Sequence, residues 1–181
     1  TTVGTNITVT PAMTITGTAI GNYTLTQPTG LKANITAKEL TVTGATAQSK
    51  VYNGNNTATI SGASLSGVVG SDNVVLATAT SGTFAQTTVG TNITVTPAMT
   101  ITGTAIGNYT LTQPTGLKAN ITAKELTVTG AVAKDKIYNG NNVAIIEGAT
   151  INGIVGSEDV VLATATSGTF AQTTVGTNIT V

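Results

Sequence analysis

The sequence predicts an all-β protein built from tandem immunoglobulin-like β-sandwich repeats. β-branched residues alternate along many short runs, and the whole pattern returns after 86 residues. Glycine and asparagine interrupt the runs at intervals of about 8 to 12 residues, a spacing typical of a sandwich. Alternation with a period of two indicates strands that bury one face. No window carries the apolar stripe of an amphipathic helix, so we expect little helix.

The repeat is the dominant feature of the sequence. The stretch TTVGTNITV begins at residues 1, 87 and 173, which sets the period at 86 residues. Solenoid repeats usually have about 20 to 50 residues, so a unit of this length suits an independent small domain. We therefore expect a string of separate domains.

Differences between the copies indicate which positions are packed. Residues 1–86 and 87–172 differ at 13 positions, all between residues 46 and 73 of the first copy. Some exchanges conserve aliphatic volume, as a packed core requires, and others change polar or charged groups, as a solvated face allows. The predicted core pairs are Val51/Ile137, Leu65/Ile151 and Val68/Ile154, and the predicted surface pairs are Gln48/Lys134, Ser49/Asp135, Ser61/Glu147, Ser66/Asn152 and Asn73/Asp159.

The strand-like runs indicate where one domain ends. KANIT at 32–36 passes into KELTV at 38–42 without a turn signal, so we place boundaries near Ala37 and Ala123. Incomplete domains on either side of a complete one would lack strands and expose sheet edges, so we expect a longer array or neighbouring chains to complete them. The predicted parts are residues 1–36, the C-terminal part of one repeat; 37–122, a complete repeat; and 123–181, the N-terminal part of the next.

Composition argues against several classes of function. The chain has neither cysteine nor histidine, so thiolate metal sites, disulfides and the commonest general base are missing. We expect no enzyme activity and no cofactor. Seven basic and seven acidic residues give a formal charge of +0, so we expect no nucleic-acid partner. No apolar run reaches the length of about 20 residues that spans a bilayer, and we expect no membrane insertion.

The carboxylates are the remaining candidates for chemistry. Asp72 lies in GSDNVV, and Glu158 and Asp159 lie in GSEDVV. Ca²⁺ takes about six to eight oxygen ligands, so these three residues are candidate calcium ligands, with an ordinary polar turn as the alternative. An isopeptide crosslink from Lys50 to an asparagine of its turn, with Glu39 as the acid, is a further candidate.

Two tyrosine motifs occur once per repeat. In Tyr-Asn-Gly, both residues of Asn-Gly accept positive φ, so we predict a tight hairpin reversal with the ring packed beneath it; a glycan-binding loop is the alternative. AIGNYTL, at 19–25 and 105–111, resembles the tyrosine corner of immunoglobulin-like sandwiches, whose hydroxyl binds the backbone. The residues with predicted structural roles are Tyr23, Tyr52, Asn53, Gly54, Tyr109, Tyr138, Asn139 and Gly140.

Taken together, the motifs resemble a known family. KVYNGNN, AIGNYTLT and ITAKELTVTG resemble the YDG-type repeat, a mostly-β, glycine-rich module. The resemblance covers essentially the whole chain in permuted phase, and it implies long stalks in large bacterial cell-surface or secreted adhesins. This chain has Tyr-Asn-Gly where the family has Tyr-Asp-Gly, so each copy lacks one carboxylate, while a role in a turn is retained.

We therefore expect structural spacer repeats of a giant extracellular adhesin or surface fibre on the bacterial cell surface. The expected partners are neighbouring repeats of the same long chain and other copies in a fibre. Two alternatives remain open. The repeats could bind glycans or surfaces multivalently, many weak sites acting together, or they could assemble into a fibre by strand exchange.

Overall fold

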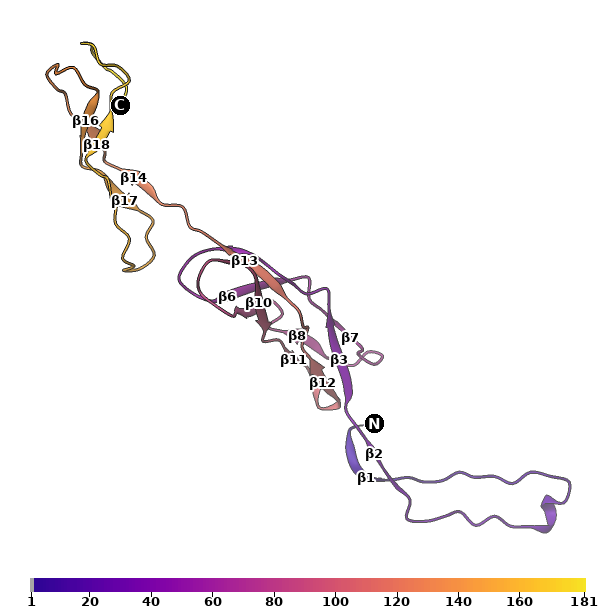
Figure 1. Cartoon of the computed structure of the whole chain (residues 1–181). Coiled ribbons are helices and arrows are strands. Elements are labelled where there is room, and N and C mark those ends of the chain that lie inside the picture. Colours follow the sequence, from indigo (N-terminus) through magenta and orange to yellow (C-terminus); the bar gives the residue numbers. More distant parts are fainter. Residues whose placement is uncertain (1) are drawn as a thin grey trace. The chain divides into compact units, whose positions relative to one another are not determined.

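The computed structural model describes residues 2–181. Strands account for 39% of the chain and 3-10 helix for 3%, which confirms the all-β prediction (Figure 1). Among the described residues, no helix has the length and apolar character needed to cross a membrane.

The described residues contain the following elements in chain order: β1 Gly4–Thr8, η1 Ile20–Asn22, β2 Lys32–Ile35, β3 Lys38–Thr43, β4 Thr46–Ala47, β5 Lys50–Val51, β6 Thr57–Ser61, β7 Ser64–Ser66, β8 Val75–Ala77, β9 Ser81–Phe84, β10 Gly90–Pro97, β11 Thr100–Thr102, η2 Ile106–Asn108, β12 Tyr109–Thr112, β13 Lys118–Thr122, β14 Thr127–Thr129, β15 Val132–Ala133, β16 Val143–Glu147, β17 Thr150–Asn152 and β18 Ser167–Thr169.

Contacts divide the chain into two compact units, each made of several segments. The first consists of Thr1–Ser49, Thr57–Ala85 and Asn92–Ala119. The second consists of Lys50–Asn56, Gln86–Thr91 and Asn120–Val181. Most of the buried apolar side chains of the described residues belong to the first unit.

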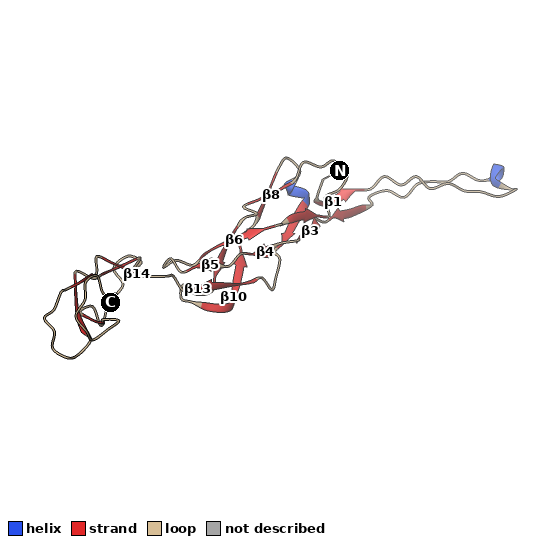
Figure 2. Ribbon diagram, turned by 90° about the horizontal axis from the view of Figure 1, so that it is seen from above, coloured by secondary structure: helices blue, strands red, loops and turns tan. Residues whose placement is uncertain are grey.

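The first unit contains two main sheets, and Figure 2 labels several of their strands, among them β3, β4, β6 and β10. In one, β4, β6, β9 and β10 are antiparallel neighbours in that order, and β13 follows β10. In the other, β3 lies between β12, which runs parallel to it, and β7, which runs antiparallel. β8 pairs with β11, and β1 pairs with β2, both antiparallel.

The core of the first unit follows the predicted alternation. Every second residue of β6 and β9 is buried, so one face of their sheet packs while the other stays exposed. In the other sheet, Leu40 of β3 and Tyr109 of β12 are buried together with Val74. Leu65 and Val68 pack against this cluster, as their aliphatic exchanges predict.

The prediction of a core position was wrong for Val51 and Ile137. Both side chains are exposed. Lys50 and Val51 form the short strand β5, and Lys50 is its partly buried residue. Because successive side chains of a strand point to opposite faces, Val51 faces outward.

The predicted surface positions are exposed in both copies, and two of the exchanges preserve a contact. Gln48 Nε2 donates to Ser61 Oγ at 2.8 Å in the first copy. In the second copy, Lys134 Nζ lies 2.9 Å from Glu147 Oε2. One cross-strand hydrogen bond is thus replaced by one ion pair, which explains how both positions changed together.

The second unit contains smaller sheets. β5 pairs in parallel with the end of β13, with Thr122 opposite Val51. β14 pairs with β17, and β16 lies between β15 and β18, all antiparallel. The strands from β14 onward repeat the positions of β3, β4, β6, β7 and β9, shifted by one period of the sequence.

Candidate functional site in the Tyr-Asn-Gly loops and tyrosine–carboxylate pairs

The first Tyr-Asn-Gly loop joins two strands that do not pair with each other. β5 pairs with β13, whereas β6 pairs with β4 and β9. Gly54 and Gly140 both have φ of 79°, but neither Asn53 nor Asn139 is among the residues with positive φ. The predicted hairpin is therefore wrong. The loop carries the chain between strands with different partners, and only its glycine adopts the left-handed conformation.

A lysine at the start of each motif holds its loop in shape. Lys50 Nζ donates to Asn53 Oδ1 at 2.9 Å, to Asn55 Oδ1 at 2.9 Å and to the Asn55 carbonyl at 2.6 Å. Lys136 Nζ donates to the Asn141 carbonyl at 2.6 Å and to its Oδ1 at 2.8 Å. Our sequence reasoning missed this role. The constant spacing from lysine to asparagine in KVYNGNN and KIYNGNN is the signal that could have revealed it.

The asparagine of each motif braces the loop from within. Asn53 Oδ1 accepts from the Asn55 amide at 3.4 Å, and Asn139 Oδ1 accepts from the Asn141 amide at 3.3 Å. Such a bond to the backbone two residues ahead is typical of asparagine and aspartate in turns. An aspartate, as in the Tyr-Asp-Gly pattern, offers the same acceptor.

Tyr52 connects the loop of the first copy to the second copy. Its ring is partly buried, and its hydroxyl donates to the Glu158 carboxylate. This hydrogen bond, with smaller effects from burial and from the carboxylate charge, raises the pKa of Tyr52 above its ordinary value. A Cβ added at Gly54 would lie 2.9 Å from Val155 Cγ1. The loop therefore contacts the 155–158 turn of the next repeat, within the second unit.

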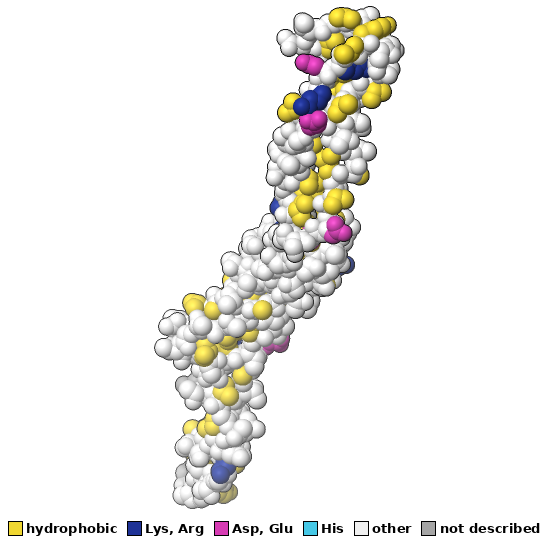
Figure 3. Space-filling view, turned by 90° about the vertical axis from the view of Figure 1, so that its left-hand side faces the viewer, with side chains coloured by type: hydrophobic (Ala, Val, Ile, Leu, Met, Phe, Trp, Pro, Cys, Tyr) yellow, Lys and Arg dark blue, Asp and Glu magenta, His cyan; other side chains and the backbone are white. Residues whose placement is uncertain are grey.

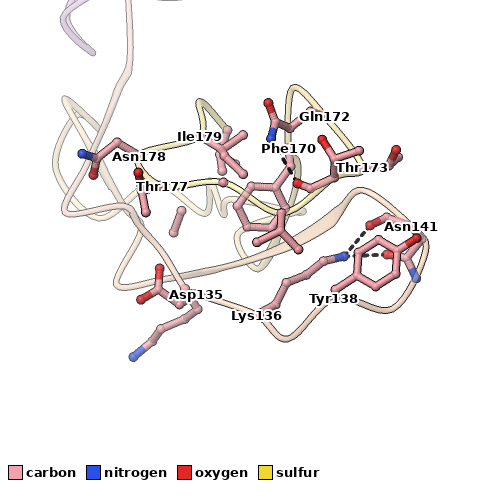
Figure 4. Close-up of a pocket in the computed structure, with 16 residues that line it drawn as sticks. Asp135, Lys136, Tyr138, Asn141, Phe170, Gln172, Thr173, Thr177, Asn178 and Ile179 are labelled. Carbon is pink, nitrogen blue, oxygen red and sulfur yellow. Dashed lines mark hydrogen bonds between the residues drawn. The ribbon is translucent and has the colours of Figure 1, made fainter.

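Tyr138, the counterpart of Tyr52, is exposed instead of packed beneath its turn. It lies on the rim of a groove with a cavity volume of about 480 Å³. Figure 4 shows the ring beside Lys136 and Asn141, with Phe170 and Ile179 across the groove. The Lys136 ammonium lies 5.6 Å from the centroid of the Phe170 ring, within the range of a cation–π contact.

The tyrosines of AIGNYTL also occur in two environments. Tyr109 is buried; its hydroxyl donates to Asp72 Oδ2 at 2.6 Å and accepts from the Val69 amide at 3.1 Å. The bond to Asp72 is the main reason that the pKa of Tyr109 is raised; burial and the Asp72 charge add to it, and the Val69 amide opposes it. Tyr23 is exposed. The Tyr109 hydroxyl thus binds a backbone amide 40 residues away in sequence, whereas a tyrosine corner binds a few residues upstream.

The candidate calcium ligands have other surroundings in the structure. Asp72 and Glu158 each accept a tyrosine hydroxyl, and Asp159 is exposed. Within residues 2–181, no three histidine, cysteine, aspartate or glutamate side chains form a cluster that could hold a metal ion. Glu39, considered as the acid of a crosslink, accepts a hydrogen bond from the Thr112 hydroxyl. On the face drawn in Figure 3, charged side chains are scattered and gather into no basic patch.

Comparison with known families identifies the repeated domain. A family model described as YDG domain matches residues 36–116 and 122–181, well over half of the chain. Each matched stretch contains one Tyr-Asn-Gly loop with its lysine. No curated protein and no solved structure matches the chain. The chain belongs to the YDG domain family.

Proposed function

We propose that this chain consists of structural spacer repeats from the stalk of a large extracellular adhesin or fibre on the bacterial cell surface. The contact between Tyr52 and Glu158 carries the proposal, because it links the loop of one repeat to a turn of the next. Since the repeats are nearly identical, the same junction can recur along an array. A partly buried, hydrogen-bonded junction restrains the motion between neighbouring domains.

A division of the chain into one complete and two partial repeats suits a spacer role. We propose that residues 37–122 form a complete immunoglobulin-like sandwich, flanked by parts of two further repeats at 1–36 and 123–181. In its support, the buried apolar residues run from Leu40 to Ile121, with Ala144 as the exception. The neighbouring repeats of the same chain are then the natural partners of each domain. The surface location rests on the YDG family resemblance and on the tandem repetition.

A binding role is the second candidate, and one observation favours it. Tyr138 is exposed on the rim of a groove that also presents Lys136 and Asn141, and exposed aromatic and amide groups suit sugar recognition. The corresponding Tyr52 is partly buried against the next repeat. A site that the next repeat closes is poorly suited to present many identical binding loops, so we favour the spacer role.

A distance measurement between the two copies tests the spacer role. The chain has no cysteine, so single cysteines at the exposed, equivalent positions Ser66 and Asn152 can carry a pair of spin labels. We expect a narrow distance distribution, which Tyr52→Phe broadens because it removes the junction hydrogen bond. The matched control Tyr138→Phe leaves the distribution unchanged. A broad distribution in the chain that carries only the labels would argue against a stiff spacer.

Glycan arrays separate the two candidates. The spacer role predicts no glycan binding by this chain. Binding that is lost in Tyr138→Ala while the thermal unfolding of the chain stays unchanged would establish the binding role instead.

A further inference from the structure

The Asn-Gly steps of this chain lie in three different settings. They are Asn53-Gly54 and Asn139-Gly140 in the Tyr-Asn-Gly loops, and Asn152-Gly153 at the end of β17. Asparagine followed by glycine can lose its side-chain amide without an enzyme, because the next backbone nitrogen attacks the side-chain carbonyl carbon and closes a five-membered ring. The reacting atoms belong to adjacent residues, so the attack has the advantage of an intramolecular reaction. The surroundings of each asparagine then decide its rate.

The first Asn-Gly step is open to this attack. Asn53 and Gly54 are both exposed, and glycine has no side chain to shield its nitrogen. Within residues 2–181, the Gly54 amide donates no hydrogen bond that would hold it away from the reaction. The loop also requires this glycine, because its φ is 79° and an added Cβ would lie 2.9 Å from Val155 Cγ1. The fold therefore retains the residue that makes the step reactive.

Two donors converge on the oxygen that receives the negative charge of this reaction. Lys50 Nζ lies 2.9 Å from Asn53 Oδ1, and the Asn55 amide lies 3.4 Å from the same atom. When the Gly54 nitrogen adds to Asn53 Cγ, an electron pair of the C=O bond moves onto Oδ1, which becomes an oxyanion. Donors already in place stabilise such a charge, and a cationic donor stabilises it more than a neutral one.

The other two asparagines have fewer donors on this oxygen. Among the described residues, Asn139 Oδ1 accepts from the Asn141 amide alone, at 3.3 Å, because Lys136 binds the oxygens of Asn141 instead (Figure 4). Asn152 donates through its side-chain nitrogen to Thr129 Oγ1 at 2.6 Å, and no donor from residues 2–181 reaches its Oδ1. The steps thus form a series with two, one and no donors on the carbonyl oxygen.

We propose that Asn53 is a site of self-catalysed deamidation, with the Lys50 ammonium as the catalytic donor. The Gly54 nitrogen loses its proton to solvent and bonds to Asn53 Cγ, and the side-chain nitrogen leaves as ammonia, so that a succinimide ring forms. Water then adds to one ring carbonyl, and the bond from that carbon to the ring nitrogen breaks. Cleavage at Cγ leaves aspartate, and cleavage at the main-chain carbonyl leaves isoaspartate. Overall, one water is consumed and one ammonia is released, with no oxidant or reductant.

The reaction supplies the loop with the carboxylate that its motif lacks. The aspartate product turns Tyr-Asn-Gly into Tyr-Asp-Gly, and its new carboxylate faces the Lys50 ammonium, which now contacts Asn53 Oδ1. The donor that assists the reaction therefore also stabilises its product. Each conversion adds one negative charge to a chain whose formal charge is +0, so converted and unconverted chains separate by ion exchange.

Peptide mapping by mass spectrometry, on the full chain incubated at mildly alkaline pH, tests the proposal. We expect Asn53 to convert about two- to fivefold faster than Asn139, the factor that an exposed charged donor supplies, and Asn152 to convert most slowly. In water enriched with heavy oxygen, each product should carry one label, because water opens the ring. An ionic strength of about 1 M should reduce the advantage of Asn53, because salt screens the ammonium.

Substitution of the two loop lysines separates activation from loop structure. Lys50→Met removes the charged donor, and it should lower the rate at Asn53 to that at Asn139 in the same molecule. Lys136→Met is the matched control, because it removes similar loop contacts but no donor to Asn139 Oδ1. The rate at Asn139 should therefore stay unchanged in Lys136→Met. Both results are read as the ratio of two rates within one chain, so a general loss of stability does not imitate them.

Three results would overturn the proposal. One is an equal rate at Asn53 and Asn139 in the unsubstituted chain. Another is a faster reaction at Asn53 in Lys50→Met, which would mean that the lysine restrains the loop instead of activating the amide. The third is loss of ammonia from Asn53 with a crosslink to Lys50 and no uptake of water, which would establish an isopeptide bond. These outcomes do not depend on the spacer role, which is tested by the distance between copies within one chain.

Discussion

Gly44 and Gly62 lie so close together that a Cβ on either would sit 2.6 Å from the carbonyl oxygen of the other. Their φ angles are 71° and 72°. On one side of this point β3 pairs with β7, and on the other β4 pairs with β6, in an unchanged register. The two strands therefore pass together from one sheet to the other. The glycines are required there by both the backbone conformation and the close approach.

We predict that Gly44→Ala destabilises the protein more than Gly116→Ala. Gly116 has a φ of 75° but nothing within 4 Å of an added Cβ, so its substitution carries only the conformational cost of about 1–2 kcal/mol. Gly44→Ala adds a clash with a backbone oxygen that cannot move aside. Urea unfolding of both variants measures the difference. Equal losses of stability would show that the two strands can separate at little cost.

The sequence predicts the elements of this fold better than their partners. Alternating Thr and Val residues predict strands, and the exchange of Leu65 for Ile151 predicts a packed position, because both signals are local. The parallel pairing of β12 with β3 joins residues some 70 positions apart, and no local pattern encodes it. For the same reason the Asn-Gly signal predicted a hairpin, although β5 and β6 have different partners.

The site shows the same limit. That asparagine and glycine shape a turn could be predicted from residue preferences. That Tyr52 would bind Glu158 could not, since this contact depends on how the next repeat folds. The two environments of Tyr23 and Tyr109 could not be predicted from their identical local sequences either.

We predict that Asn53→Asp strengthens the first loop. Asn53 Oδ1 already accepts from the Lys50 ammonium at 2.9 Å, so a carboxylate there would form an ion pair. A largely exposed pair of this kind contributes about 0.2–1 kcal/mol. Thermal unfolding should show a small rise in Tm that disappears at an ionic strength of about 1 M.

Asn139→Asp is the matched control for this effect. In the second loop, Lys136 Nζ donates to Asn141 instead of Asn139. Its other hydrogen bond goes to the Val143 carbonyl. The new carboxylate at residue 139 should therefore stabilise its loop less than the one at residue 53. Identical gains in the two loops would show that the lysine contact is not the cause.

We predict unequal effects of one substitution in the two copies. Leu40 is 0% exposed and packs against Val74 and Tyr109, whereas its counterpart Leu126 is 36% exposed. Leu40→Ala should lower the free energy of unfolding by about 2–5 kcal/mol, and Leu126→Ala by about 0.5 kcal/mol or less. Urea unfolding of both variants measures the two effects. Equal effects would mean that Leu126 is already packed.

We predict that the bond between Tyr109 and Asp72 makes stability fall at high pH. The folded protein holds the Tyr109 proton more tightly than the unfolded chain does, because its pKa is raised. The stabilisation is complete below the ordinary tyrosine pKa of about 10 and is lost as the pH rises through the raised value. Tyr109→Phe should lower stability at neutral pH and flatten its decline above pH 10, as measured by urea unfolding across this range.

Tyr23→Phe separates this effect from the titration of the other groups. Tyr23 is exposed and has the same local sequence as Tyr109. All other groups contribute equally in both variants, so the difference between the two curves isolates Tyr109. Tyr23→Phe should follow the unsubstituted protein at every pH. If Tyr109→Phe also follows it, the bond to Asp72 contributes nothing to the stability of the fold.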